Sequence, residues 1–176
     1  HPALFFAFLG TMATVNADTW ATELGVLDSK PPRLITTGGV VEPGTSGGIS
    51  RTGTLAAAAG ATLIGLIGWG LWSLAGGKSD ASWDGRGAPT GPALLVACVL
   101  GGLAGSLVDS LVGATVQAIY YSERRAKETE RSVEVDGSPN RLVRGWAWLN
   151  NDWVNFLSSA VGAIVGTLVY VLMTPA

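Results

Sequence analysis

The sequence predicts an all-α membrane protein, a polytopic helix bundle with about four transmembrane segments in one domain that covers residues 1–176. The composition supports this class, because 48% of the residues are hydrophobic and only 14% are charged, whereas soluble domains carry about a quarter charged residues. Four apolar stretches also approach the roughly 20 residues that a helix needs to cross a bilayer. Glycines that recur within these stretches predict closely packed helices.

The composition excludes several other classes of protein. A formal net charge of -2 argues against a nucleic-acid partner, which needs a clustered basic surface. The single cysteine, Cys98, excludes a disulfide framework and any multi-cysteine metal site. The single histidine, His1, stands at the start of the chain, so a Ser-His-Asp triad is excluded as well.

The predicted spans cover about residues 2–20, 52–75, 92–121 and 153–173. The second span is the most uniformly apolar, and the third is interrupted by Asp109. Because the chain begins with His1 and enters an apolar stretch at once, we expect a fragment or a processed chain that lacks upstream helices. Such a multi-pass integral protein has the lipid bilayer as its immediate partner, and association into homo-oligomers is left open.

Basic residues predict the orientation of the bundle. Of the eleven lysines and arginines, nine fall in the first and third connections, about 22–51 and 122–152, and two fall in the second. With four spans, the first and third connections share one side, which the positive-inside rule makes cytoplasmic. The charged stretch 122–139 predicts a mobile connection, with a short exposed helix as the alternative. The membrane is left open among the endoplasmic reticulum or another internal membrane, a plastid membrane and a prokaryotic plasma membrane.

Polar residues interrupt the apolar sequence at the predicted cytoplasmic end of the first span, where Asn16, Asp18 and Glu23 stand. A carboxylate at this depth is costly unless it is paired or bound to a cation, so this stretch is a functional candidate. The alternative is an interfacial helix end with a cap. Asp109 lies inside the third span, where a protonated or hydrogen-bonded structural acid is the alternative to a functional one.

A loop rich in glycine and hydroxyl residues precedes the second span. Exposed backbone N–H groups ahead of a helix suit a phosphate group, although no Gly-Lys-Ser/Thr follows as in a Walker A loop. An ordinary turn is the alternative. The candidate phosphate- or nucleotide-binding residues are Arg33, Gly44, Thr45, Ser46, Gly47 and Gly48.

Amide and acid side chains open the fourth span. Asn151 and Asn155 are one helical turn apart, and Asp152 stands between them. These groups are candidates for positioning a metal ion or a polar headgroup, while the neighbouring tryptophans fit an interfacial belt. The predicted topology places all these polar stretches at one membrane face. Their oxygen atoms suit Mg²⁺, and Mg²⁺ beside bound phosphate suits phosphoryl transfer.

Four of these stretches carry a family resemblance. The runs NADTWATELGVL, PPRLITTG with PGTSGGIS, GSLVDSLVGATVQAIYY and WLNNDWVNFLSS occur in this order between Asn16 and Ser159. They closely resemble the transmembrane protein 19 family of integral membrane proteins, which includes plant phytyl-phosphate kinase of the tocopherol pathway. The resemblance also implies helices upstream of this chain.

A more distant likeness is to dolichol kinases and CDP-diacylglycerol synthases, which use CTP and Mg²⁺ at the cytoplasmic membrane face. This likeness implies that Asp18 and Asp109 are the metal-binding, catalytic pair, although the loop lacks the lysine that those enzymes carry nearby. The two resemblances imply an enzyme, a Mg²⁺-dependent kinase that transfers a phosphoryl group from CTP or ATP to an isoprenoid monophosphate. An ion-coupled transporter or channel with intramembrane Asp sites and a non-catalytic membrane assembly factor stay open as alternatives.

Overall fold

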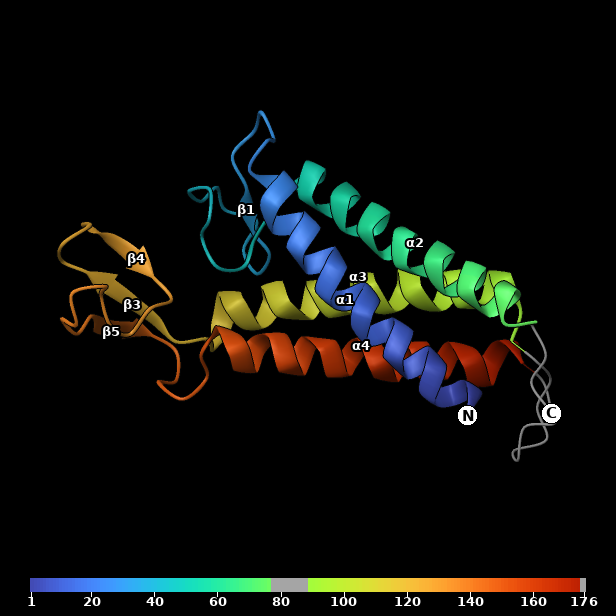
Figure 1. Ribbon diagram of the computed structural model, residues 1–176. Coiled ribbons are helices and arrows are strands. Elements are labelled where there is room, and N and C mark those ends of the chain that lie inside the picture. Colours follow the sequence, from blue (N-terminus) through green and yellow to red (C-terminus); the bar gives the residue numbers. More distant parts are fainter. Residues whose placement is uncertain (77–88, 175–176) are drawn as a thin grey trace.

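Four long helices lie side by side in the computed structural model, which describes residues 1–76 and 89–174 (Figure 1). The prediction of a helical bundle is confirmed. Within the described residues, α2, α3 and α4 are long and apolar enough to cross a membrane. The first predicted span stays a prediction, because α1 is not among these helices and its second half carries Asp18 and Glu23. The helices are α1 (Pro2–Gly25), α2 (Arg51–Leu74), α3 (Gly91–Thr115) and α4 (Asn151–Met173).

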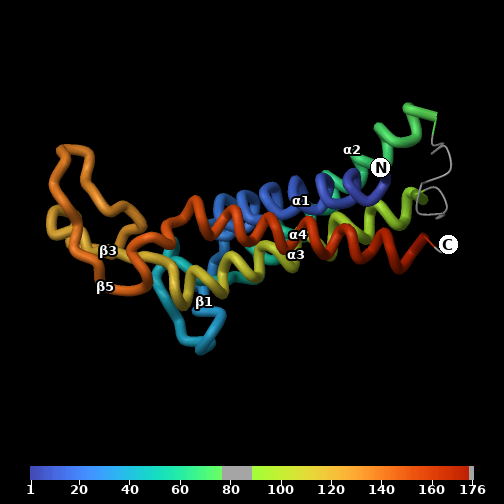
Figure 2. The backbone as a smooth tube through the Cα atoms, turned by 90° about the horizontal axis from the view of Figure 1, so that it is seen from below, coloured from blue at the N-terminus to red at the C-terminus, as the bar shows by residue number. Residues whose placement is uncertain are grey.

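The first and third connections lie at the same end of the helix bundle. Figures 1 and 2 show segment 26–50 and the strands between α3 and α4 at this end, with the two chain termini at the other. This arrangement agrees with the prediction that the first and third connections share a side. Most of the second predicted connection, including Lys78 and Arg86, lies outside the described residues.

Two small antiparallel sheets accompany the helices. β1 (Arg33–Leu34) pairs with β2 (Gly48–Ile49) just before α2 begins. The second sheet follows α3 and has the strand order β4-β3-β5. It projects beyond the ends of α3 and α4 (Figure 2). Its strands are β3 (Ile119–Ser122), β4 (Lys127–Thr129) and β5 (Arg141–Arg144).

The second sheet corrects two predictions about the third connection. α3 ends at Thr115, short of the predicted boundary, because residues 119–121 are β-branched or aromatic and pair with β4 and β5. The stretch 122–139 consists of strands and turns, so the alternative of a short exposed helix is wrong, while its mobility stays a prediction. Glu134 there is only 9% exposed and forms an ion pair with Arg125 at 2.9 Å. Hydrogen bonds from Ser122 and Arg125 hold the pKa of the Glu134 carboxyl below its ordinary value, so this buried group stays charged.

Side-chain caps begin three of the helices. Ser50, Thr90 and Asn150 each accept a hydrogen bond from the backbone N–H three residues further on, at 3.0, 3.3 and 3.1 Å respectively. α3 also has Pro92 in its first turn, where no helical N–H bond is lost. These three helix starts are therefore encoded in the local sequence.

α1, α3 and α4 meet at a crossing lined by glycines. The single hydrogen of the Thr14 hydroxyl is shared between two carbonyl oxygens, that of Gly10 at 3.0 Å and that of Gly101 at 3.1 Å. Gly162 of α4 faces the same point, since a Cβ there would lie 2.6 Å from the Gly10 carbonyl oxygen and against the Thr14 hydroxyl. Only glycine permits backbones to approach so closely. The crossing joins the three helices one turn away from Asp18.

Gly162→Ala should weaken the bundle, because the added methyl group would overlap the backbone of α1. We expect the free energy of unfolding to fall by about 1–3 kcal/mol, the range for overpacking a close-packed site. Thermal unfolding in detergent micelles measures the change. Gly70→Ala on α2 is the matched control, since no atom lies within 4 Å of its added Cβ. Equal unfolding midpoints for the two variants would contradict the role of the crossing.

Candidate functional site

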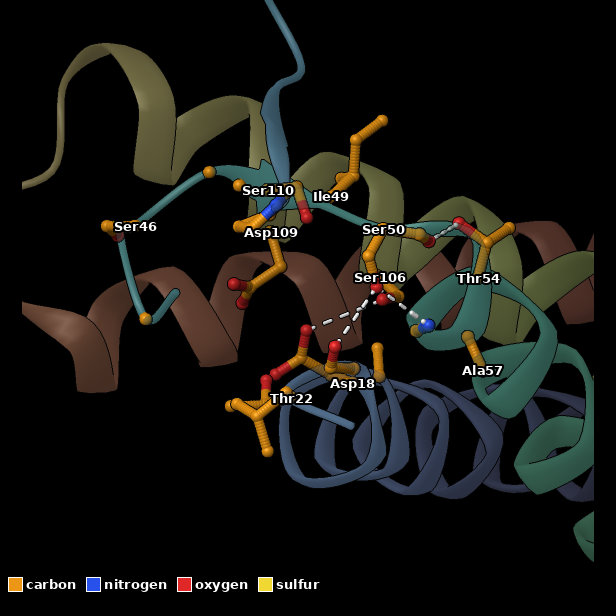
Figure 3. A pocket seen from close by; sticks show the side chains of 18 of the residues that line it. Asp18, Thr22, Ser46, Ile49, Ser50, Thr54, Ala57, Ser106, Asp109 and Ser110 are labelled. Atoms are coloured by element: carbon orange, nitrogen blue, oxygen red, sulfur yellow. Dashed lines mark hydrogen bonds between the residues drawn. The ribbon is translucent and has the colours of Figure 1, made fainter. Parts of the chain in front are cut away.

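A cavity of about 390 Å³ lies at the end of the bundle that carries the sheets (Figure 3). Its walls are the last turns of α1, the first turns of α2 and α4, the second half of α3 and the loop 43–50. We predicted that these polar stretches lie together at one end of the bundle, and the position of the cavity agrees with that. The chemical role of each residue stays a prediction. The predicted site residues that line the cavity are Asp18, Glu23, Gly44, Thr45, Ser46, Gly47, Gly48, Asp109, Asn151 and Asn155.

Asp18 and Asp109 face the cavity from α1 and α3 (Figure 3). The Ser106 hydroxyl donates to Asp18 Oδ1 at 3.4 Å, and the Ser158 hydroxyl donates to Asp109 Oδ2 at 3.2 Å. Within residues 1–76 and 89–174, neither carboxylate forms an ion pair with a basic side chain. Two half-buried carboxyl groups without a basic partner need a cation or a proton to offset the cost of their burial.

The lining of the cavity is strongly acidic. Its acidic members are Asp18, Glu23, Asp28, Asp109 and Glu130, and Lys30 is the basic residue among the described lining residues. The backbone N–H of Thr52 donates to Asp28 at 3.0 Å and holds the pKa of Asp28 below its ordinary value, so that this carboxylate remains charged. A ligand that carries phosphate therefore needs a cation to offset the charge of these walls.

Two glycines shape the loop that precedes α2. Gly44 and Gly47 adopt φ angles of 86° and 82°, in the left-handed region that glycine tolerates. The N–H of Gly48 closes a turn that begins at Thr45 by donating to the Thr45 carbonyl at 2.9 Å. Gly47 also touches the backbone of α3, since a Cβ on it would lie 2.6 Å from the backbone nitrogen of Ala114. Close packing against α3 therefore sets the position of the loop.

A buried side chain, Gln117, connects the loop to α4. The Ser46 hydroxyl donates to Gln117 Oε1 at 2.8 Å, and Gln117 Nε2 donates to Asn151 Oδ1 at 3.5 Å. Gln117 is only 1% exposed, while both of its partners line the cavity. Asn155 follows one turn further along α4 and lines the cavity as well.

Three predicted site residues lie elsewhere. Arg33 donates to the Gly38 carbonyl at 2.7 Å within its own loop, and Asn16 donates to the Gly60 carbonyl of α2 at 2.8 Å. Asp152 is exposed in the first turn of α4, where the positive end of the helix favours an acid. None of the three lines the described cavity. Each has a local or interhelical role that spacing along the sequence does not reveal.

The lining also includes polar residues that were not among the predicted site residues, such as Ser106, Ser110, Asp28, Lys30 and Glu130. Ser106 precedes Asp109 by three positions on α3, and this helical spacing is a signal that identifies it. Asp28 and Lys30 follow α1 closely but stand outside any motif. Glu130 comes from the end of β4, so only the folded sheet brings it to the cavity.

The oxygen donors of the cavity fit a hard cation. Mg²⁺ takes oxygen ligands, commonly one or two carboxylates together with water and substrate phosphates. In the described part of the chain, no group of three or more His, Cys, Asp or Glu side chains forms a metal site. Asp18 and Asp109, with the hydroxyls of Ser106 and Ser110 nearby, therefore fit a cation whose remaining positions are open to water or substrate.

Apolar helices with an acid- and hydroxyl-lined cavity at one end define a multi-pass helical membrane protein with a polar site near one membrane face. Comparison with known families agrees with this class. Residues 1–163 match the family described as integral membrane protein DUF92, and the chain belongs to this family.

Curated proteins similar to this chain come from several organisms. Protein PGR of Arabidopsis thaliana is 38% identical over 156 residues, which are 89% of this chain and 51% of that protein. An uncharacterized membrane protein of Methanocaldococcus jannaschii is 36% identical over 164 residues, 93% of this chain and 50% of that protein. The chain thus spans about half the length of these relatives.

A third relative is the Arabidopsis thaliana protein named VTE6, chloroplastic. It is 29% identical over 161 residues, 92% of this chain and 36% of that protein. No solved structure matches the chain at a significant level.

Gly47→Ala should displace the loop more than Gly44→Ala. Both changes force a non-glycine residue into left-handed backbone, at a cost of about 1–3 kcal/mol. Only at Gly47 does the added Cβ also meet the Ala114 backbone, whereas nothing lies within 4 Å at Gly44. We therefore expect faster hydrogen exchange across residues 45–49 in Gly47→Ala, measured by mass spectrometry. Equal exchange in the two variants would show that contact with α3 does not hold the loop.

Proposed function

We propose that this chain forms the phosphoryl-transfer site of a prenyl- or polyprenyl-phosphate kinase. The bond between the γ-phosphorus of CTP or ATP and its bridging oxygen breaks, and a bond to an oxygen of an isoprenoid monophosphate forms. The products are the isoprenoid diphosphate and the nucleoside diphosphate. The observation that carries the proposal is that Asp18, Asp109 and the loop 44–48 line one cavity.

The residues of the cavity have two roles in this proposal, which are binding the cation and positioning the phosphate groups. Asp18 and Asp109 would hold Mg²⁺ from two different helices, and the ion would supply positive charge to offset that of the phosphates. In the loop 44–48, the N–H groups of Thr45 and Gly48 close turns within the loop, so the N–H groups of Gly44, Ser46 and Gly47 are the ones that bind phosphate oxygens. The acceptor is already a phosphate anion, so no side chain has to remove a proton from it.

The position of the cavity supports an amphiphilic acceptor. The cavity lies at the polar end of helices that are apolar enough to cross a membrane. An isoprenoid tail lies along these helices in lipid, while its phosphate reaches the cavity at the cytoplasmic face. The resemblance to the family that includes plant phytyl-phosphate kinase supports the same class of acceptor.

An ion-coupled transporter is the second candidate function. The acidic lining, with Lys30 as the basic residue among its described members, favours a cation even when no phosphate is bound. Under this reading Asp18 and Asp109 are ion or proton sites, and nucleotide plays no part. Cation flux into proteoliposomes in the absence of nucleotide measures this activity directly.

Radiolabel transfer in proteoliposomes distinguishes the two candidates. The full-length protein is supplied with γ-labelled CTP or ATP and with prenyl monophosphates of several chain lengths. We expect labelled prenyl diphosphate that forms only when Mg²⁺ is present. Failure of both nucleotides to label any of the acceptors, together with nucleotide-independent cation flux, would overturn the kinase and support the transporter.

Asp18→Asn and Asp109→Asn should each lower the rate of transfer by about 100-fold or more, the scale seen when a key electrostatic group is lost. An amide keeps the shape of the carboxylate but lacks the charge that a hard cation needs. Asp152→Asn is the matched control, because Asp152 is exposed and does not line the cavity. Near-normal turnover of Asp18→Asn at saturating Mg²⁺ would show that Asp18 is not a metal ligand.

A further inference from the structure

The side-chain amide of Gln117 joins two walls of the cavity. Its Oε1 accepts from the Ser46 hydroxyl at 2.8 Å on the loop side, and its Nε2 donates to Asn151 Oδ1 at 3.5 Å on the α4 side. With 1% of its surface exposed, Gln117 lies beneath its two partners, both of which line the cavity. The oxygen and the nitrogen of this buried amide are therefore each hydrogen-bonded to a residue on a different wall of the cavity.

The surrounding backbone holds Gln117 in place. Its N–H donates to the Val112 carbonyl at 3.1 Å, and the next residue, Ala118, donates to the Leu149 carbonyl at 2.9 Å. Gly145, with a φ of 79°, packs on the Gln117 carbonyl so closely that no Cβ would fit. The end of α3 and the segment before α4 thus form one unit around this side chain, and its bonds to Ser46 and Asn151 assign the orientation of the amide.

The orientation of this amide decides which atoms its partners turn toward the cavity. A hydroxyl has one hydrogen, so Ser46, after donating to Gln117, offers only oxygen lone pairs to a ligand. Asn151 has used its carbonyl oxygen as the acceptor, which leaves its NH₂ group as a donor. One wall therefore presents an oxygen that suits a cation, and the other presents N–H groups that suit an anion.

We propose that Gln117 is a positioning residue, which makes Asn151 an N–H donor to a phosphate oxygen and Ser46 an oxygen ligand on the cation side. This inference rests on the proposed function, because it places a Mg²⁺-bound phosphate in the cavity. A neutral amide has an advantage in this acidic lining. A lysine or arginine would form ion pairs with Asp18 or Asp109 and compete with the cation, whereas an amide binds phosphate without that competition.

Gln117→Glu tests the proposal, because an ionised carboxylate still accepts from Ser46 but no longer donates to Asn151. Asn151 then turns its NH₂ group toward the new carboxylate and its carbonyl oxygen toward the phosphate. We expect Mg²⁺–ATP and Mg²⁺–CTP to bind about 10- to 100-fold more weakly at about pH 8. Isothermal titration calorimetry on the full chain in lipid nanodiscs measures the affinities.

The pH profile separates a change in hydrogen-bond polarity from a packing defect. At about pH 5 the new buried carboxyl group takes up a proton and donates to Asn151 again, so the affinity of the variant should approach that of the unaltered protein at the same pH. Comparison at equal pH removes the effect of any titration of Asp18, Asp109 and the nucleotide phosphates. The unaltered protein should show no such gain on acidification. Thr167→Val is the control, because that hydroxyl bonds to the Ala163 carbonyl at 2.8 Å away from the cavity, and its affinity should stay unchanged.

Asn151→Asp gives a second, independent route to the same loss. An ionised carboxylate at that position cannot donate to phosphate, so binding should weaken to a similar extent and recover at low pH. If Gln117→Glu does not fold, the nucleotide affinity of Asn151→Asp against pH tests the inference.

Each outcome bears on the proposal. Unchanged affinity in both variants at every pH would overturn the inference and leave the kinase proposal intact. A loss of affinity that does not recover at low pH would also overturn it, since a packing defect does not depend on the new proton. If the unaltered protein binds neither nucleotide with Mg²⁺, both the inference and the proposed function fail.

Discussion

The bundle depends on the point where the Thr14 hydroxyl of α1 meets the Gly101 carbonyl of α3 beside Gly162 of α4. In a bilayer no water is available to satisfy buried polar groups, and lipid competes with apolar side chains for helix surfaces. Close backbone approach and an interhelical hydrogen bond are therefore what hold such helices together. The crossing also places the cavity, because Asp18 lies one turn beyond Thr14 and within 3.4 Å of Ser106 on α3.

The charge of the cavity limits what it can bind. Its described walls carry five acidic side chains and the single basic residue Lys30, so a phosphate group is admitted only together with a cation. In the proposed function, the remaining donors are neutral groups, namely the backbone N–H groups of Gly44, Ser46 and Gly47 and the Asn151 amide. This division leaves Asp18 and Asp109 available to a cation rather than engaged with lysine or arginine side chains.

The end of α3 connects the parts of the protein that surround the cavity. Ala114 contacts the glycine loop, Gln117 bonds to both the loop and α4, and β3 begins two residues later. The sheet in turn brings Glu130 to the wall of the cavity. The sheet is therefore connected to the cavity by direct contacts at the end of α3.

The sequence by itself determined the class of protein, the positions of most helices and the membership of the glycine loop in the site. These properties are local, because apolar length, caps such as Ser50 and Asn150, and glycine at left-handed positions act within a few residues. The tertiary structure decided which polar groups meet. It brought Glu130 to the cavity and placed Gln117 beneath two residues that line it. It also engaged Asn16 with a neighbouring helix and turned residues 119–122 into a strand. Strand pairing and interhelical hydrogen bonds join residues that are distant along the chain, so their partners depend on packing that local patterns do not encode.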